Sequence, residues 1–397
     1  MPDTFIEENF QESKPWVSVL VPVYQVEGYI ERCARSVFEQ TYPNIEYIFC
    51  DDGSPDRSIE VLESVMKDYP ERAKHTRIIR FDENKGLATM RNTLVDACQT
   101  NWLLHEDSDD WMEPDLVDTL VKKQQETGAD IVCADFISHE KDRHERYSFM
   151  ESDKKEDYFR LVLKNNDAHY SWGKLIRTSL YREHNIKIAA DCKKAEDMRA
   201  IIPLFYYADK IAATHQLGCH YDMTRPQRIS TLTEGNIKVK GGWLLDTMFV
   251  VQGFLADKEE EYVKLFNKTI YEKICSYVTL AVYYRNKATH KHMRKRAVAF
   301  ARQYPYVKGD AKTRVMFHLK SNYFLYRQFM KWVYRNETVA DNNTKGGGIN
   351  NGDVTADGKQ DTKSVYNNSA DNREFAFSYS KNNYAHRRSL LPVWLTN

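Results

Sequence analysis

A run of acidic side chains just after residue 104 is the stretch of this sequence best suited to chemistry. It places four carboxylates within five positions, at Glu106, Asp107, Asp109 and Asp110. Like charges this close repel one another, and no helix or strand face gains from them. A divalent cation among them offsets the repulsion, because hard cations take oxygen ligands. The run therefore predicts a metal site, with a solvated acidic turn as the alternative.

The residues before this run predict where the acids lie. Residues 102–104 (WLL) have the pattern of a short buried strand, which places the acids at its carboxyl end. In open α/β sheets, ligands bind at that edge. We therefore expect a metal ion there, with a nucleotide diphosphate bound across it.

The chain from residue 16 to residue 136 alternates between strand and helix patterns. Residue 22, a proline, is expected to close the first strand at its carboxyl end. Strands separated by amphipathic helices predict βαβ units, and hence an α/β fold with a mainly parallel sheet flanked by helices. The expected strands are residues 17–23, 45–50, 76–81, 102–105 and 131–136, and the helices between them are centred on residues 34, 64, 92 and 120.

Three loops are expected at the same sheet edge as the acids, and their residue types suit a nucleotide. Tyr24 can stack on a base, and Asp51 can accept hydrogen bonds from an imide or a ribose. Gly86 allows close approach of the backbone to a ligand, and Arg91 can reach a phosphate. Read separately, Tyr24 could be a packing residue and residues 51–54 an ordinary turn.

Composition narrows the class of protein. The 397 residues contain 57 Lys and Arg and 57 Asp and Glu, so no net charge points to nucleic acid. The seven cysteines form no C-x-x-C pair, which fits a reducing compartment. The first fifteen residues are acidic and polar, without an apolar signal region. These features predict a cytoplasmic protein.

Five motifs in order resemble family 2 glycosyltransferases of the GT-A fold. They are VSVLVPVY at 17–24, SVFEQTYP at 36–43, DDGS at 51–54, NKG at 84–86 followed by Arg91, and DSDDW at 107–111. The resemblance implies a nucleotide-sugar donor, with a UDP-sugar favoured, bound Mn²⁺ or Mg²⁺, and transfer with inversion at the anomeric carbon.

The resemblance also implies roles for particular residues. Asp109 and Asp107 correspond to the metal-binding D-x-D motif, with Asp109 as the direct ligand. The nucleotide-sugar side comprises Pro22, Tyr24, Glu27, Asp51, Asp52, Gly86, Arg91, Asp107 and Ser108. The sequence departs from the family pattern at Gln25, Thr100 and Glu106, where the family favours Asn, Gly and an apolar residue.

Residues 137–235 carry the motifs expected on the acceptor and diphosphate side. Trp172 and Lys174 resemble the W-x-K-L segment of many family members. The family pattern places its general base at Asp197, next to Glu196, at the start of a helical run that Pro203 is expected to bend or end. Simple capping of that helix is the alternative. A basic segment that closes over the diphosphate in the family corresponds to His220, Arg225 and Arg228.

The remaining sequence predicts a helical module and a tail. The domains expected are an extension at 1–15, a glycosyltransferase domain at 16–235 (divided at 136), a helical module at 236–335 and a disordered low-complexity tail at 336–397. A basic aromatic stripe at 312–335 predicts either core packing or peripheral contact with the inner face of an anionic membrane.

The function expected is transfer of one sugar to a glycan or lipid-linked acceptor in surface polysaccharide biosynthesis. The Q-x-x-R-W signature of processive synthases is absent from the sequence. Two alternatives stay open: a degenerate scaffold that binds nucleotide-sugar without turnover, and a nucleotidyltransferase, which also holds metal and nucleotide on an α/β sheet.

Overall fold

The computed structural model describes residues 16–141, 143–164, 168–225, 232–233 and 235–308. The chain forms two compact units. Among the described residues, the first unit lies within 16–225 and 238–273, and the second within 232–237 and 274–308. Residues 238–273 therefore belong to the unit that carries the sheet, beyond the domain boundary expected at 235.

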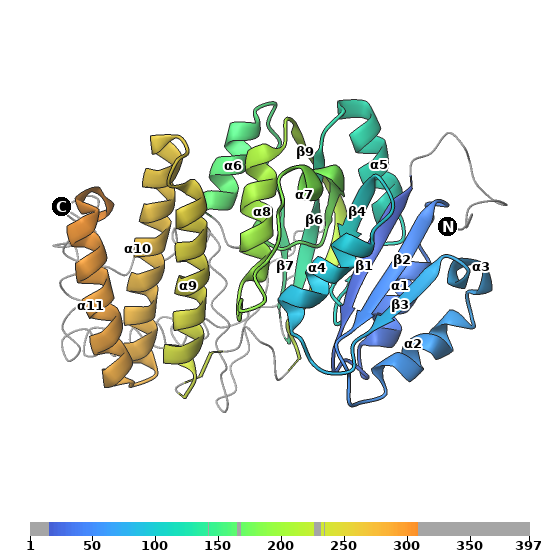
Figure 1. Cartoon of the computed structure of the whole chain (residues 1–397), viewed down its shortest axis with the longest axis horizontal. Helices are drawn as coiled ribbons and strands as arrows, with labels where there is room; N and C mark the ends of the chain where they lie inside the picture. Colours follow the sequence, from blue (N-terminus) through green and yellow to red (C-terminus); the bar gives the residue numbers. More distant parts are fainter. Residues whose placement is uncertain (1–15, 142, 165–167, 226–231, 234, 309–397) are drawn as a thin grey trace, which may run out of the picture. The chain divides into compact units, whose positions relative to one another are not determined.

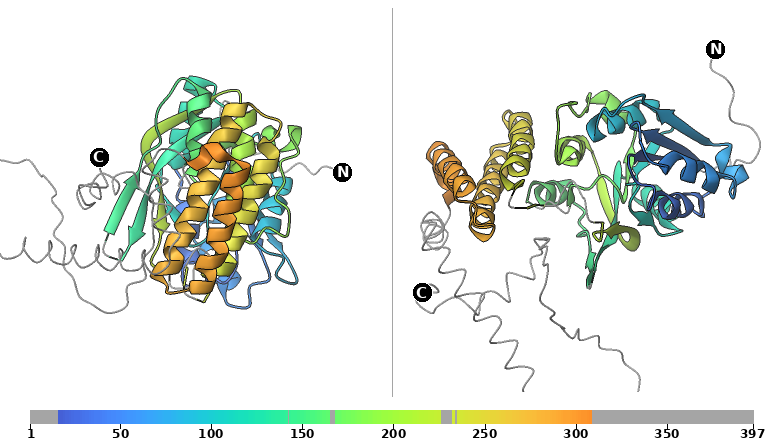
Figure 2. Two further views of the ribbon diagram at one scale, coloured as in Figure 1. Left: turned by 90° about the vertical axis from the view of Figure 1, so that its left-hand side faces the viewer. Right: turned by 90° about the horizontal axis from the view of Figure 1, so that it is seen from below.

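The amino-terminal part of the first unit is the predicted βαβ arrangement (Figure 1). Its strands run parallel in the order β3-β2-β1-β4. Helices lie on both faces of this part of the sheet (Figure 2): α4 packs on β1 and β2, while α1 packs on α2. The bounds are β1 Val17–Val23, α1 Ile30–Phe38, β2 Ile45–Asp51, α2 Ser58–Met66, α3 Pro70–Ala73, β3 Thr76–Arg80, α4 Leu87–Ala97 and β4 Trp102–His105.

Strand β1 is buried at all seven positions, as a central strand with helices on both faces must be. Helix α1 buries Ile30, Cys33, Ala34, Val37 and Phe38, which is the face that its i, i+3, i+4 spacing predicts. Pro22 lies inside β1 rather than at its end. It pairs with Cys50 of β2 but lies beyond Leu20, the last residue that pairs with β4.

The second part of the sheet is mixed. The sheet contains nine strands among the described residues and continues β4-β8-β6-β9-β5, with β7 paired to β6. The pairs β4–β8, β6–β8, β6–β7 and β5–β9 are antiparallel, and β6–β9 is parallel. The bounds are β5 Trp111–Met112, α5 Leu116–Thr127, β6 Ile131–Glu140, β7 Arg143–Tyr147, α6 Lys155–Lys164, β8 Lys174–Arg177, α7 Ser179–Glu183, α8 Glu196–Tyr207 and β9 Ile211–Asp222.

The proline in α8 neither ends nor starts that helix. Pro203 lies at the eighth of its twelve positions, and the helix continues to Tyr207. The helix is buried on both sides of the proline, so tertiary packing offsets the lost backbone hydrogen bond.

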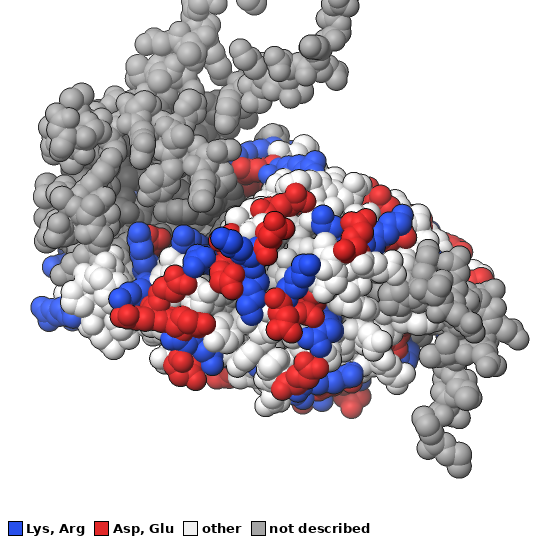
Figure 3. All heavy atoms as spheres, turned by 90° about the horizontal axis from the view of Figure 1, so that it is seen from above, with Lys and Arg blue, Asp and Glu red and all other residues white. Residues whose placement is uncertain are grey.

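The helical part consists of α9 (Ile237–Leu255), α10 (Glu260–Tyr283), α11 (Lys287–Gln303) and a short 3-10 helix at Pro305–Lys308. In the part of the chain that the structure describes, no helix is both long and apolar enough to span a bilayer. The basic stripe at 312–335 and the tail at 336–397 lie outside the described residues. On the face seen in Figure 3, acidic and basic side chains are interspersed, as the zero net charge suggests.

Candidate active site

The loops after β1 and β2, and the loop before α4, meet at the carboxyl edge of the parallel strands. Asp52 joins two of them: its Oδ1 accepts a hydrogen bond from the amide of Lys85 (2.6 Å), and its Oδ2 accepts one from the amide of Gly86 (2.8 Å). Gly86 has φ +88°, a conformation that side chains disfavour. Because both carboxylate oxygens of Asp52 accept backbone hydrogen bonds, this residue fixes the loop before α4.

The other residues predicted on the nucleotide side lie at or near this edge. Tyr24 is half-buried, and Asp51 is buried with its Oδ1 accepting the amide hydrogen of Ser54 (2.9 Å). Glu27 is exposed and accepts from the amide of Arg57 (3.3 Å). Ser108, within the acidic run, is buried.

The acidic run follows β4 directly, as predicted. Glu106 and Asp110 are buried, and one oxygen of each has no hydrogen-bond partner among the described residues. Burial first, and then the charges of neighbouring acids, raise the pKa of both carboxyls well above the ordinary range. Asp107 and Asp109 are more accessible, with side chains 27% and 25% exposed. Burial raises their pKa values as well.

Arg91, in α4, lies between Asp107 of this run and a second pair of acids, Glu196 and Asp197. Its side chain is 3% exposed, and its Nη2 lies 2.8 Å from Oδ1 of Asp107 and 3.3 Å from Oδ1 of Asp197. Its Nε lies 3.3 Å from Oε1 of Glu196. Burial by itself lowers the pKa of Arg91, but the charges of these three acids raise it. The arginine therefore joins the predicted metal motif to the predicted base.

Glu196 and Asp197 begin α8. Ala195, just before them, has φ +58°, a left-handed conformation that is costly for alanine and sets the direction of the pair. Ser171 donates a hydrogen bond to Oδ1 of Asp197 (2.7 Å). Among the described residues, only Oδ1 of Asp197 has hydrogen-bonding or ion-pair partners, which leaves Oδ2 for a proton. Burial, and then the charge of Asp197, raise the pKa of Glu196 to about 7.

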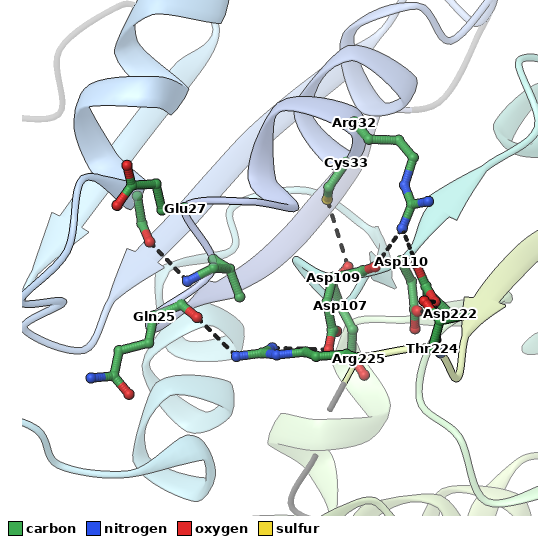
Figure 4. A network of polar contacts seen from close by, with 12 residues as sticks. Gln25, Glu27, Arg32, Cys33, Asp107, Asp109, Asp110, Asp222, Thr224 and Arg225 are labelled. Atoms are coloured by element: carbon green, nitrogen blue, oxygen red, sulfur yellow. Dashed lines mark hydrogen bonds and ion pairs between the residues drawn. The ribbon is translucent and has the colours of Figure 1, made fainter. Parts of the chain in front are cut away.

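Two arginines contact Asp109 from opposite parts of the chain (Figure 4). Arg225, after β9, donates to its Oδ2 (3.0 Å) and to the carbonyl oxygen of Gln25 (2.8 Å). Arg32, in α1, donates to the carbonyl oxygen of Asp109 (3.0 Å) and to Oδ2 of Asp222 (2.6 Å).

The donor set suits a divalent cation that is held in part by a ligand. Among the described residues, no group of three or more His, Cys, Asp and Glu side chains is arranged to hold a metal ion. However, Mg²⁺ is commonly bound by one or two carboxylates with phosphate oxygens and water completing its shell. Asp107 and Asp109 are partly exposed, and the orphaned oxygens of Glu106 and Asp110 show that this region has an excess of acceptors. The residues present therefore fit such an ion.

Two residues predicted on the acceptor or diphosphate side are buried. Trp172 is 2% exposed and stacks on Tyr170. Lys174 is 1% exposed, with Nζ donating to the carbonyl oxygen of Tyr170 (2.5 Å) and lying over the ring of Phe149. These contacts are those of core residues and do not support a direct contact with substrate.

His220 is part of an imidazole and aromatic cluster next to the acidic run. Its Nε2 lies 2.7 Å from Oε1 of Glu113, and its Nδ1 lies 2.8 Å from Nε2 of His139. Its ring stacks on Trp111, whose ring also lies 3.8 Å from the guanidinium of Arg32. Arg228 lies outside the described residues.

Sequence reasoning missed Arg32, Asp222 and Ser171. Asp222 accepts from Arg32, and its own amide donates to Oδ1 of Asp110 (2.7 Å), so these residues hold the acidic run in place. Arg32 is 77 and 190 positions away from its two partners, and Ser171 is 26 positions away from Asp197. No local pattern could have indicated them.

Two hollows border the site. The one beside Asp197, lined also by Arg91, Ser171 and Tyr181, has a volume of about 10 Å³, which is room for about one water molecule. The Asp197 side chain is itself 16% exposed. A second, open hollow of about 630 Å³ is lined by α1 residues together with Trp111, Glu113 and His220.

The fold is of the GT-A type, and comparison with known proteins agrees. Residues 18–184 match the family model described as "Glycosyl transferase family 2". The match covers less than half of the chain, and over these residues the chain is similar to glycosyltransferase family 2.

Individual relatives are similar over part of their length. Glycosyltransferase GlyA of Streptococcus pneumoniae serotype 4 is 41% identical over 122 residues, which are 31% of this chain and 17% of GlyA. The uncharacterized glycosyltransferase EpsJ of Bacillus subtilis is 29% identical over 204 residues, 50% of this chain and 58% of EpsJ. The chain thus spans less than two thirds of the length of these curated relatives.

The fold resembles that of a solved structure, S. aureus TarS 1-349 in complex with UDP. The TM-score is 0.59 at 18% sequence identity, and the match covers 81% of this chain and 92% of the TarS chain.

Proposed function

We propose that this chain transfers one sugar from a nucleotide-diphosphate sugar to a hydroxyl of a glycan or lipid-linked acceptor, with inversion at the anomeric carbon. In this proposal Asp107 and Asp109 hold Mn²⁺ or Mg²⁺, and Asp197 takes the proton of the acceptor hydroxyl. The product would be part of a cell-surface polysaccharide.

A nucleotide-sugar donor is supported by the family 2 domain and by the loops at the sheet edge. A UDP-sugar is our preferred donor, in keeping with the UDP complex of TarS, which shares the fold. Tyr24 and Asp51 are the residues proposed to contact the base and ribose, because an aromatic ring stacks on a base and a carboxylate accepts hydrogen bonds.

The observation that carries the proposal is the position of Arg91 between two sets of acids. It lies within 3.3 Å of Asp107 on one side and of Glu196 and Asp197 on the other. An inverting transfer needs the diphosphate and the attacking hydroxyl close together, on opposite sides of the anomeric carbon. The buried ion-pair network keeps the corresponding protein groups at a fixed separation.

The reaction requires a base, because a sugar hydroxyl is a poor nucleophile at neutral pH. Oδ1 of Asp197 is oriented by Ser171 and Arg91, and Oδ2 is proposed to accept the proton. A bound Mn²⁺ or Mg²⁺ would neutralise the developing charge on the departing diphosphate. Arg91 opposes the effect of burial on the pKa of Asp107 beside it.

Glu196 is the other carboxylate in reach of this chemistry. Its pKa of about 7 matches the value that favours a general base at neutral pH. Its Oε1 faces Nε of Arg91 from the first turn of α8, and its side chain is 12% exposed. We assign it an orienting role and Asp197 the proton transfer, a division that substitutions can test.

Peripheral contact with the inner face of the cytoplasmic membrane is part of the proposal, because a lipid-linked acceptor lies there. The predicted stripe at 312–335 lies outside the described residues, but α11 has a suitable charge. Residues 285–308 contain eight Lys and Arg and no Asp or Glu. Lys291, Arg294 and Lys295 are exposed on α11, opposite its buried face.

A thermal-shift screen of nucleotide-sugars, each with and without Mn²⁺, tests the proposal. A true donor raises the melting temperature in proportion to its binding free energy, and the gain should require metal. With the donor found, release of a nucleoside diphosphate and an inverted product anomer would support the transferase. Binding without turnover would favour a scaffold, and pyrophosphate release from a nucleoside triphosphate would favour a nucleotidyltransferase.

A further inference from the structure

The carboxylate proposed as the direct metal ligand already has a cationic partner. Nη1 of Arg225 donates to Oδ2 of Asp109 across 3.0 Å, and the two side chains are 22% and 25% exposed. Nη2 of the same guanidinium donates to the carbonyl oxygen of Gln25 (2.8 Å), and its Cζ lies 5.2 Å from the centroid of the Tyr29 ring. Figure 4 shows this side chain reaching across from the end of β9 to the loop after β1.

The two arginines at Asp109 hold different atoms. Arg32 binds the carbonyl oxygen and is itself paired with Asp222 at 2.6 Å, so the backbone of Asp109 is fixed. Arg225 binds the carboxylate, and Asp109 is its only acidic partner among the described residues. The carboxylate can therefore exchange its partner while the backbone stays in place.

We propose that Arg225 is the counter-ion of Asp109 in the metal-free chain and that metal binding must displace it from Oδ2. This inference rests on the proposed function, in which Asp109 is a metal ligand. A cation alone competes with a guanidinium that remains next to Asp109. A diphosphate gives that guanidinium another anion to bind, as arginine binds phosphate well.

The consequence is cooperative binding of metal and diphosphate. Each ligand removes an obstacle to the other: the metal releases Arg225, and the diphosphate takes it up. By linkage the coupling is reciprocal, so each ligand should tighten the other by the same factor. Arg225 thus lowers the affinity for metal when no diphosphate is bound and raises it when the donor is bound.

Removal of the side chain should change the two affinities in opposite directions. Without its competitor, Mn²⁺ alone should bind Arg225→Ala roughly fivefold more tightly, which is the upper range for a partly exposed ion pair. UDP in the presence of saturating Mn²⁺ should bind about tenfold more weakly, because a charge-assisted hydrogen bond to phosphate is lost. Arg225→Lys should restore both values in part.

The measurement is a titration of the full chain with Mn²⁺, with free Mn²⁺ followed by electron paramagnetic resonance, in the absence and presence of UDP. Arg35→Ala is the matched control. It removes an arginine of α1 that pairs with Glu31 and Asp68 rather than with Asp109, and neither affinity should change. Circular dichroism would verify that each variant is folded.

The outcomes distinguish a failure of the proposed exchange at Arg225 from a failure of the metal assignment of Asp109. Tighter Mn²⁺ binding together with weaker UDP binding in Arg225→Ala supports the exchange. Unchanged or weaker binding of Mn²⁺ alone in this variant overturns it, even if the wild type binds Mn²⁺ with UDP. If the wild type binds no Mn²⁺ under either condition, the metal assignment of Asp109 fails, and the exchange fails with it.

Discussion

Nη2 of Arg91 lies 3.3 Å from Oδ1 of Asp197, and this contact connects α4, the helix after β3, with α8. The same nitrogen donates to Asp107. One buried guanidinium therefore sets the distance between the proposed metal motif and the proposed base.

Arg91→Met should destabilise the chain strongly. The substitution leaves Asp107, Glu196 and Asp197 without their shared cation in a buried site, and removing one partner of a buried ion pair costs about 3–5 kcal/mol. Urea denaturation would measure the loss. Arg57→Met is the control, because Arg57 is exposed and its one ion pair among the described residues is with the exposed Glu60, so its loss should be much smaller. Equal losses for the two variants would contradict the network.

The parallel half of the fold followed from the sequence because it rests on local patterns. Buried runs such as β1 and the 3.6-residue period of α1 need only their own residues to be recognised. Of the strands of the mixed half, only the strand at 131–136 was predicted. Strand β5 has two residues and β8 has four, and each exists because a partner strand is present rather than through its own propensity.

In the candidate site, too, the local motifs could be predicted from the sequence and the long-range contacts could not. The motif positions of Asp107, Asp109 and Arg91 could be recognised in the sequence, as could Glu196 and Asp197. Their mutual contacts could not, because Arg91 and Glu196 are 105 positions apart. The buried state of Lys174 was also unforeseen, since a lysine in a motif gives no sign that its ammonium group faces a backbone carbonyl.

Asp109→Ala should abolish the metal-dependent part of nucleotide binding. The carboxylate is the proposed direct ligand, so calorimetric titration with UDP should give the same weak affinity with and without Mn²⁺. The fold should survive, because Arg32 holds the backbone carbonyl oxygen of residue 109 rather than its side chain. A variant that keeps the full gain from Mn²⁺ would show that the metal lies elsewhere.

His169 should make the chain less stable in acid. Burial lowers its pKa to about 4, although the carbonyl oxygen of Val162, which contacts Nε2, opposes the shift. The unfolded chain has a value near 6.5, so between these values it binds a proton that the folded chain does not. Stability from this group is therefore present above pH 6.5 and lost as the pH falls toward 4.

The magnitude can be measured against His169→Gln, which keeps a hydrogen-bond donor but does not titrate. Between pH 7 and pH 5, the free energy of unfolding of the wild type should fall by roughly 2 kcal/mol more than that of the variant. Equal falls in urea denaturation experiments would mean that His169 is not the group responsible.

The basic face of α11 should bind anionic vesicles. Replacing Lys291, Arg294 and Lys295 by glutamine should weaken binding to the vesicles by roughly a hundredfold, at about 1 kcal/mol for each charge near the surface. High salt should release the wild type. A control that replaces the exposed Lys67, Lys122 and Lys141 should bind normally. Sedimentation that ignores lipid charge and salt would argue against this surface.

The base is the centre of the account, and one comparison tests it most directly. Single-turnover rates of nucleoside diphosphate release should be measured for the wild type, Asp197→Asn and Glu196→Gln, with donor affinity measured alongside. Asp197→Asn keeps its size and loses the proton acceptor, so donor binding should survive while the rate falls by about 10²–10⁴-fold. Glu196→Gln should lose much less. A near-wild-type rate for Asp197→Asn would contradict the account, and a large loss confined to Glu196→Gln would assign the proton to Glu196 instead.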